Sequence, residues 1–244
     1  MVSKNELKFI KSLKVKKYRV REKRFVVEGA KNVQELMNSN YEIDLILSSQ
    51  HFYDVNRSKT REFRIEIVGD KVLNEAGSFK SNNSCIAVVR SRDFNVDEID
   101  LSALTFVLDG VSDPGNLGTI IRTLDWFGFN QLVCSEDSAE LYNPKVVNSS
   151  MGSFSRVNTF HLPLKQFFDL NKLPVYGMDM NGKNLFDVAI QSPSVIVLGS
   201  ESHGISPDVR KRIDYTVTIP KKGAAESLNV GIATGIVAAH LRIP

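Results

Sequence analysis

The C-terminal part of this 244-residue chain is organised around one stretch, LDGVSDPGNLGTIIR at residues 108–122. An apolar run at residues 104–108 leads into it and predicts a buried strand. The proline and glycine that follow suit a type II turn, and Asn116 is then a good N-cap for a helix that extends to about Phe127. A strand, a loop and a helix in this order favour an α/β fold.

Apolar strands and helices continue to alternate through the rest of this part of the chain. Strands are expected at residues 132–134, 175–178, 195–198 and 215–219, and helices at residues 143–150 and 228–241. Strands that are apolar along their whole length are typical of a parallel sheet with helices on both faces. We therefore predict such a sheet.

The first third of the chain predicts a smaller α/β domain, because its elements follow a β-α-β order twice. The expected strands are residues 24–29, 43–47, 64–68 and 86–89, and the expected helices are residues 4–14, 30–38 and 70–76. The following residues, 91–100, are polar and weakly patterned. We place a linker at residues 94–101, between domains of residues 1–93 and 102–244.

A second junction between a strand and a loop is VLGSESHGIS at residues 197–206. Its loop carries one carboxylate, Glu201, and one imidazole, His203, between Gly199 and Gly204. Ligands bind beyond the carboxyl ends of the strands in open parallel sheets, and glycines let the backbone approach a ligand closely. Glu201 therefore suits a general acid or base, a ligand contact or a helix cap.

A third junction, IPKKGAAESLNV at residues 219–230, joins a strand to the last helix. Ser227 is a plausible N-cap, and Asn229 then lies in the first turn. The helix at residues 228–241 is apolar nearly all the way round, which only a helix buried on most sides tolerates. It fits either a central core helix or a helix at a subunit interface.

Composition excludes several classes of protein. The hydrophobic share of 42% and the charged share of 24% are ordinary for a globular protein. No apolar stretch is long enough to cross a membrane, and because the Lys-rich start has no long apolar run we expect no secretory signal. The two cysteines and four histidines lack disulfide or metal-ligand spacing. We expect a cytoplasmic protein that uses no metal.

Positive charge is concentrated at the N-terminus. Residues 1–24 hold ten Lys or Arg and only two acids, while the net charge of the whole chain is +3. A basic segment on a nearly neutral body indicates a polyanionic partner such as RNA. A solvated helix face would produce the same pattern.

Taken together, in this order and near these separations, the three junctions resemble the signature motifs of the SpoU (SPOUT class) RNA methyltransferases, over residues 102–244. Residues 14–90 also resemble that family's N-terminal substrate-binding domain, which is similar to a small ribosomal protein. The matching stretches there are KKYR at residues 16–19 and FVVEG at residues 25–29. The resemblance implies a C-terminal parallel-sheet methyltransferase domain with a trefoil knot, a rare exception to unknotted topology.

The resemblance also implies a reaction and its site. Such proteins transfer a methyl group from S-adenosylmethionine to a ribose 2′-hydroxyl, and ribosomal RNA is the preferred substrate here, with transfer RNA as the alternative. The positions that match the family's polar active-site residues are Asn116, Arg122, Glu201, Ser227 and Asn229. The positions that would bind the methyl donor, largely through the main chain, are Leu198, Gly199, Gly204, Ile219 and Leu228. A homodimer with the last helix near the interface is implied as well.

Arg122 has two possible roles in such a reaction. The family proposal makes the matching residue the general base, although a guanidinium is normally always charged. Alternatively, Arg122 holds the adjacent RNA phosphate and stabilises the developing alkoxide. The chain departs from the family pattern at Lys221, where methionine is common, and at Ser202, where glycine is common. Both changes are expected to affect the shape or affinity of the donor pocket.

Two other classes of function remain open from the sequence. One is an α/β enzyme that binds a dinucleotide such as NAD, but the G-x-G-x-x-G fingerprint is missing. The other is a non-catalytic RNA-binding protein with the same fold, against which the presence of all five polar positions argues.

Overall fold

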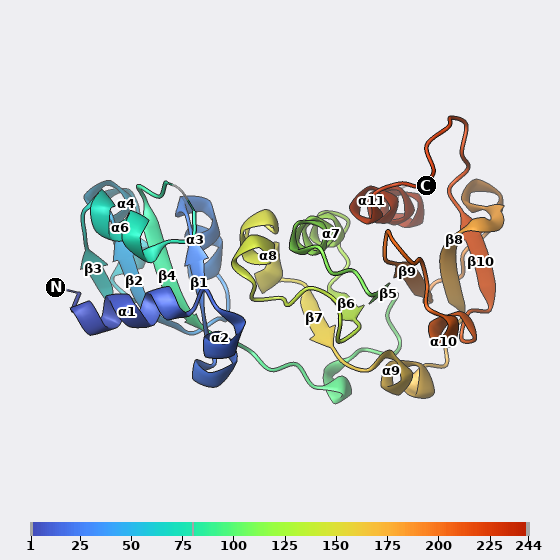
Figure 1. The fold of residues 1–244 in the computed structure, drawn as a ribbon, viewed down its shortest axis with the longest axis horizontal. Helices are drawn as coiled ribbons and strands as arrows, with labels where there is room; N and C mark the ends of the chain where they lie inside the picture. Colours follow the sequence, from blue (N-terminus) through green and yellow to red (C-terminus); the bar gives the residue numbers. More distant parts are fainter. Residues whose placement is uncertain (1, 80, 243–244) are drawn as a thin grey trace. The chain divides into compact units, whose positions relative to one another are not determined.

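A computed structural model describes residues 2–79 and 81–242 of the chain (Figure 1). Contacts within it divide the chain into two compact units. The first unit consists of Met1–Asp93 and Tyr142–Ser155, and the second of Phe94–Leu141 and Arg156–Pro244. No helix among the described residues is long and apolar enough to cross a membrane.

The first unit is built on a mixed sheet of four strands in the order β1-β4-β2-β3. Strand β4 is antiparallel to both of its neighbours, whereas β2 and β3 are parallel. The strands are β1 (Arg24–Glu28), β2 (Ile43–Ser48), β3 (Ile65–Ile67) and β4 (Cys85–Arg90). All four lie where the sequence predicts strands.

The helices of the first unit include several that the sequence did not predict. Its described residues form α1 (Lys4–Ser12), α2 (Lys16–Glu22), α3 (Ala30–Met37), α4 (Gln50–Val55), α5 (Arg57–Thr60), α6 (Asp70–Ala76), α8 (Pro144–Ser149) and the short 3-10 helix η2 (Ser153–Ser155). Helix α2 was not predicted because four of its seven residues are cationic and it has no apolar stripe. Its Arg19 is buried and donates hydrogen bonds to the carbonyl oxygens of Leu13 and Lys14.

The segment Tyr142–Ser155 belongs to the first unit by its contacts, although in sequence it lies between two strands of the second. The Tyr142 ring stacks on Phe25 with 4.3 Å between centroids, and Phe154 meets Phe25 edge-on at 5.8 Å. The Tyr142 hydroxyl lies 3.2 Å from that of Tyr41. Nothing in the sequence predicts this grouping.

The second unit has a six-stranded sheet in the order β10-β8-β9-β5-β6-β7, and every pair of neighbours is parallel. This confirms the parallel sheet predicted from the apolar strands. The strands are β5 (Thr105–Asp109), β6 (Gln131–Cys134), β7 (Asn158–His161), β8 (Val175–Asn184), β9 (Val195–Gly199) and β10 (Tyr215–Thr218).

Helices cover both faces of this sheet, with α7 and α11 on one side and α9 and α10 on the other (Figure 1). Phe167 of α9 and Val209 of α10 join the core cluster that includes Val107 and Val197 of the central strands. The helices are α7 (Pro114–Trp126), α9 (Leu164–Leu170), α10 (Pro207–Arg210) and α11 (Val230–Arg242), with short 3-10 helices η1 (Val96–Glu98) and η3 (Leu185–Asp187).

Helix α7 begins differently from the prediction. Its N-cap is Asp113, whose carboxylate accepts a hydrogen bond of 2.8 Å from the main-chain N–H of Asn116. Pro114 is therefore the first helical residue rather than part of a type II turn, because a fixed φ and a missing N–H suit that position. The expectation that Asn116 is the N-cap was wrong.

Helix α11 also begins later than predicted, at Val230. The side-chain oxygen of Asn229 accepts hydrogen bonds from the main-chain N–H groups of Gly231 and Ile232, at 2.9 and 3.3 Å. Asn229 thus satisfies donors that the helix itself leaves unpaired. The expectation that Ser227 caps this helix was wrong, because the helix starts three residues further on.

Candidate functional site

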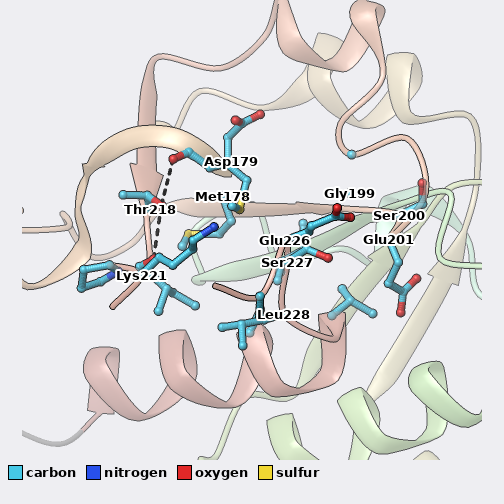
Figure 2. Close-up of a pocket in the computed structure, with 18 of the residues that line it drawn as sticks. Met178, Asp179, Gly199, Ser200, Glu201, Thr218, Lys221, Glu226, Ser227 and Leu228 are labelled. Atoms are coloured by element: carbon cyan, nitrogen blue, oxygen red, sulfur yellow. Dashed lines mark hydrogen bonds between the residues drawn. The ribbon is translucent and has the colours of Figure 1, made fainter. Parts of the chain in front are cut away.

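A cavity of about 540 Å³ lies at the carboxyl ends of β8, β9 and β10 (Figure 2). Its walls come from residues 178–180 on β8, from residues 198–201 at the end of β9 and Gly204 in the loop that follows, and from most of residues 218–228 at and after the end of β10. Val230 and Ala233 of α11 complete them. This is the edge of a parallel sheet at which ligands are expected to bind. Figure 2 shows Glu201 at one end of the cavity, and Asp179, Thr218 and Lys221 at the other.

The structure places all five residues that the resemblance assigned to the methyl donor in the wall of this cavity. They are Leu198, Gly199, Gly204, Ile219 and Leu228. The loop between Gly199 and Gly204 is closed by two main-chain hydrogen bonds between Ser200 and Gly204, of 3.1 and 2.9 Å. A Cβ atom on Gly199 would lie only 2.1 Å from the Gly204 carbonyl carbon, so this packing requires glycine.

Three of the five predicted polar residues form one hydrogen-bonded group beside the cavity, which we call the polar group: Asn116, Glu201 and Asn229. The side-chain N–H of Asn116 donates to the Glu201 carboxylate. The Asn116 oxygen accepts a hydrogen bond of 2.9 Å from the side-chain N–H of Asn229. Each side chain of the polar group is therefore held by a neighbour. Asn229 also caps α11, so the polar group is tied to the start of that helix.

Ser227 and Arg122 lie outside the polar group. Ser227 lines the cavity. Arg122 is exposed on α7, does not line the cavity, and makes no hydrogen bond or ion pair with any residue in 2–79 or 81–242. Arg122 is the sixth residue after Asn116 on the helix, a rise of about 9 Å along the axis. Its guanidinium is therefore available to an anion from outside the chain.

Asp109, which sequence reasoning missed, supports the loop that carries Glu201. It is the last residue of β5 and is buried, and its carboxylate accepts a hydrogen bond of 2.7 Å from the main-chain N–H of Ser206. This bond ties the far end of the loop back to the sheet. An acidic residue directly after an apolar strand was the available signal.

Sequence reasoning also missed Asp179, in the cavity wall, which directly follows the apolar residues 175–178. Burial alone would raise the pKa of its carboxyl. Hydrogen bonds from Arg210 at 2.6 Å and from the Asn181 N–H at 3.2 Å nevertheless hold that pKa below its usual value. Asp179 thus stays ionised inside the wall, paired with a cation.

The two departures from the family pattern lie in different places. Lys221 lines the cavity. Ser202 does not, and its hydroxyl lies 2.7 Å from Nδ1 of His203 on the exposed part of the loop. Of the two, only Lys221 is in direct contact with the cavity.

Comparison with known proteins agrees with this geometry. Residues 103–239 match the SpoU rRNA Methylase family, and residues 4–87 match the MRM3-like substrate binding domain. The chain is 26% identical over 236 residues to the 23S rRNA (guanosine(2553)-2′-O)-methyltransferase RlmP of Bacillus subtilis (strain 168), covering 95% of this chain and 94% of that protein.

Two solved structures are similar over nearly the whole chain. A putative RNA methyltransferase of the TrmH family from Porphyromonas gingivalis is 35% identical with a TM-score of 0.89, covering 99% of this chain and 98% of that one. An AdoMet-bound rRNA methyltransferase from Sinorhizobium meliloti is 25% identical with a TM-score of 0.88, covering 99% and 96%. The chain belongs to the SpoU rRNA methylase family.

Proposed function

We propose that this protein transfers a methyl group from S-adenosylmethionine to a ribose 2′-hydroxyl of RNA, with ribosomal RNA as the substrate. The observation that carries the proposal is the polar group, Asn116, Glu201 and Asn229, at the edge of a cavity of donor size. The Bacillus subtilis relative is named for this reaction on 23S rRNA, and the Sinorhizobium meliloti structure holds AdoMet.

The cavity fits S-adenosylmethionine in size and in lining. A volume of about 540 Å³ lies within the range of small-molecule pockets. Apolar side chains of Met178, Leu198 and Ile219 suit the adenine ring, and Gly199 and Gly204 let the main chain approach it closely. The donor supplies a methyl group already activated on a sulfonium. The chain has to align the hydroxyl and help it lose its proton.

The polar group and Arg122 suit different parts of this task. The hydrogen bonds that fix Asn116 and Asn229 hold them in one arrangement, which favours the orientation of a ribose at the cavity edge. The Arg122 guanidinium has no hydrogen-bond or ion-pair partner among the described residues. Because a guanidinium stays protonated, we assign it the binding of the neighbouring phosphate and the stabilisation of the alkoxide rather than the role of base.

We assign RNA binding to the first domain, residues 1–93, joined by a linker at residues 94–101 to the methyltransferase domain, residues 102–244. Support comes from the match to a substrate-binding domain and from the basic N-terminal segment. We also propose that this domain is similar to a small ribosomal protein, which its small mixed sheet and covering helices favour.

We further propose a homodimer formed through the second unit. Helices α7 and α11 pack together and leave two large apolar side chains outside, Trp126 with 84% and Ile232 with 56% of its surface exposed. Apolar surface of this kind on adjacent helices favours association. Family membership supports a trefoil knot in the C-terminal chain, and ribosomal RNA as substrate supports a cytoplasmic location.

The decisive experiment is methyl transfer from labelled S-adenosylmethionine to total RNA prepared from cells that lack this protein, followed by nuclease digestion and nucleoside analysis. We expect a labelled 2′-O-methylnucleoside, recovered from the ribosomal fraction. Label recovered in transfer RNA instead would make transfer RNA the substrate. Folded protein that binds the donor but labels no RNA would contradict the proposal and favour a non-catalytic RNA-binding protein.

A further inference from the structure

The ten cations of residues 1–24 fall into two groups in the structure. Six of them have partners within the chain: Lys11 pairs with Glu75, Lys14 with the Gly77 carbonyl, Arg19 with two carbonyls, Arg21 with Glu22, Lys23 with Asp93 and Arg24 with Asp44. The other four make no hydrogen bond or ion pair with any described residue: Lys4, Lys8, Lys16 and Lys17. Total charge therefore overstates what this segment offers a polyanion.

Arg19 illustrates the difference. Only 4% of its surface is exposed, and its guanidinium donates hydrogen bonds of 2.9 and 2.8 Å to the carbonyls of Leu13 and Lys14 at the end of α1. It joins α1 to α2 and is not accessible to a phosphate. Lys16 and Lys17, at the start of the same helix, are exposed and unpaired within the described chain.

The exposed side of α2 carries more than charge. Val20 lies one helical turn beyond both Lys16 and Lys17, and 64% of its surface is exposed. On the adjacent face, the guanidinium of Arg21 lies 4.9 Å from the centroid of the Tyr18 ring. A seven-residue helix thus presents together two ammonium groups that have no partner in the described part of the chain, an apolar side chain and a flat aromatic–guanidinium pair.

We infer that α2 contacts unpaired nucleotides of the RNA substrate, with Lys16 and Lys17 on the phosphates and the Tyr18–Arg21 pair against the bases. This inference rests on the proposed function. Phosphates alone would require only lysines, whereas flat and apolar groups gain from base faces that a duplex keeps stacked inside. The mixture on α2 therefore favours single-stranded over double-stranded RNA.

The charge half of the inference is tested with the full-length protein and a fluorescent, unstructured RNA of about 16 nucleotides, by anisotropy over a range of salt concentrations. In Lys16→Ala/Lys17→Ala we expect the slope of log K against log salt to shrink by about 1.4, which is about 0.7 for each phosphate lost. We also expect affinity to fall about tenfold. The matched control Lys11→Ala/Lys23→Ala removes two paired cations and should change both far less. Equal effects of the two double variants would overturn the inference.

The contact of the Tyr18–Arg21 pair with the bases is tested by comparing binding to the same RNA and to its duplex. Wild type should bind the single strand more tightly, and Tyr18→Leu should reduce that preference about tenfold. Tyr53→Leu, which removes another half-buried tyrosine on α4, should not. Equal affinity of wild type for both RNAs, or an unchanged preference in a Tyr18→Leu variant with normal circular dichroism, would overturn it. Methyl transfer is measured in a separate assay, so the binding results test this inference independently of the proposed reaction.

Discussion

Asn116 is held at both ends of its side-chain amide, because its N–H donates to Glu201 and its oxygen accepts from Asn229. A side chain fixed on both sides cannot rotate without breaking a hydrogen bond. Arg122 shows the opposite condition on the same helix, since no residue of the described ranges restrains its guanidinium. The two residues are therefore suited to different roles, one to orient and one to receive an incoming anion.

Replacement of Arg122 by alanine should lower methyl transfer by about a hundredfold or more, because the alkoxide and the phosphate would lose their charged partner. Donor affinity, measured by calorimetry, should be unchanged, since Arg122 does not line the cavity. Arg156→Ala is the matched control, because Arg156 is also an exposed arginine but is paired with Asp125 at 2.7 Å. Turnover near the wild-type rate in folded Arg122→Ala would refute its role.

At the scale of elements, the start of α7 separates stability from activity. Asp113 caps the helix through the main-chain N–H of Asn116, while the side chain of Asn116 belongs to the polar group and donates to Glu201. Asp113→Ala should therefore reduce the free energy of unfolding by about 1 kcal/mol, measured in urea. Asn116→Ala should change it by less than about 0.5 kcal/mol yet impair methyl transfer. The reverse result would restore Asn116 as the cap.

The loop after β9 makes a second prediction at this scale. An alanine at position 199 would force its Cβ against the main chain of Gly204, so the loop that lines the cavity has to move. We expect Gly199→Ala to weaken donor binding at least about tenfold and to destabilise the fold by about 1–3 kcal/mol. Gly69→Ala is the control, because a Cβ there meets nothing within 4 Å. Unchanged donor affinity would show that the loop does not shape the pocket.

For the whole molecule, the proposed homodimer is tested on α11. Ile232 exposes 56% of its surface on this helix although the helix is apolar nearly all round. Ile232→Lys should convert a dimer into a monomer, measured by light scattering after gel filtration, because a buried ammonium at an interface is costly. Val55→Lys, at a site 65% exposed on α4, should leave the mass unchanged. A wild-type protein that is already monomeric would rule the dimer out.

Much of the fold was accessible from the sequence, because strands and helices follow local periodicity. Apolar runs such as residues 104–108 and 195–198 predicted a parallel sheet, and all the strands expected in both units are present. The pattern was weaker at element ends. The starts of α7 and α11 were misplaced because several neighbouring side chains can cap a helix, and only the local geometry selects one.

The residue types of the site were also visible in the sequence, but their contacts were not. Asn116 lies 85 residues from Glu201 and 113 from Asn229. Only the order of the strands, which places β9 beside β5 in the sheet, brings these residues together. The same holds for the segment Tyr142–Ser155 and for the division of the N-terminal lysines into paired and free. Local pattern determines elements because each depends on residues a turn or a strand apart, whereas side-chain partners depend on distances that only the folded chain defines.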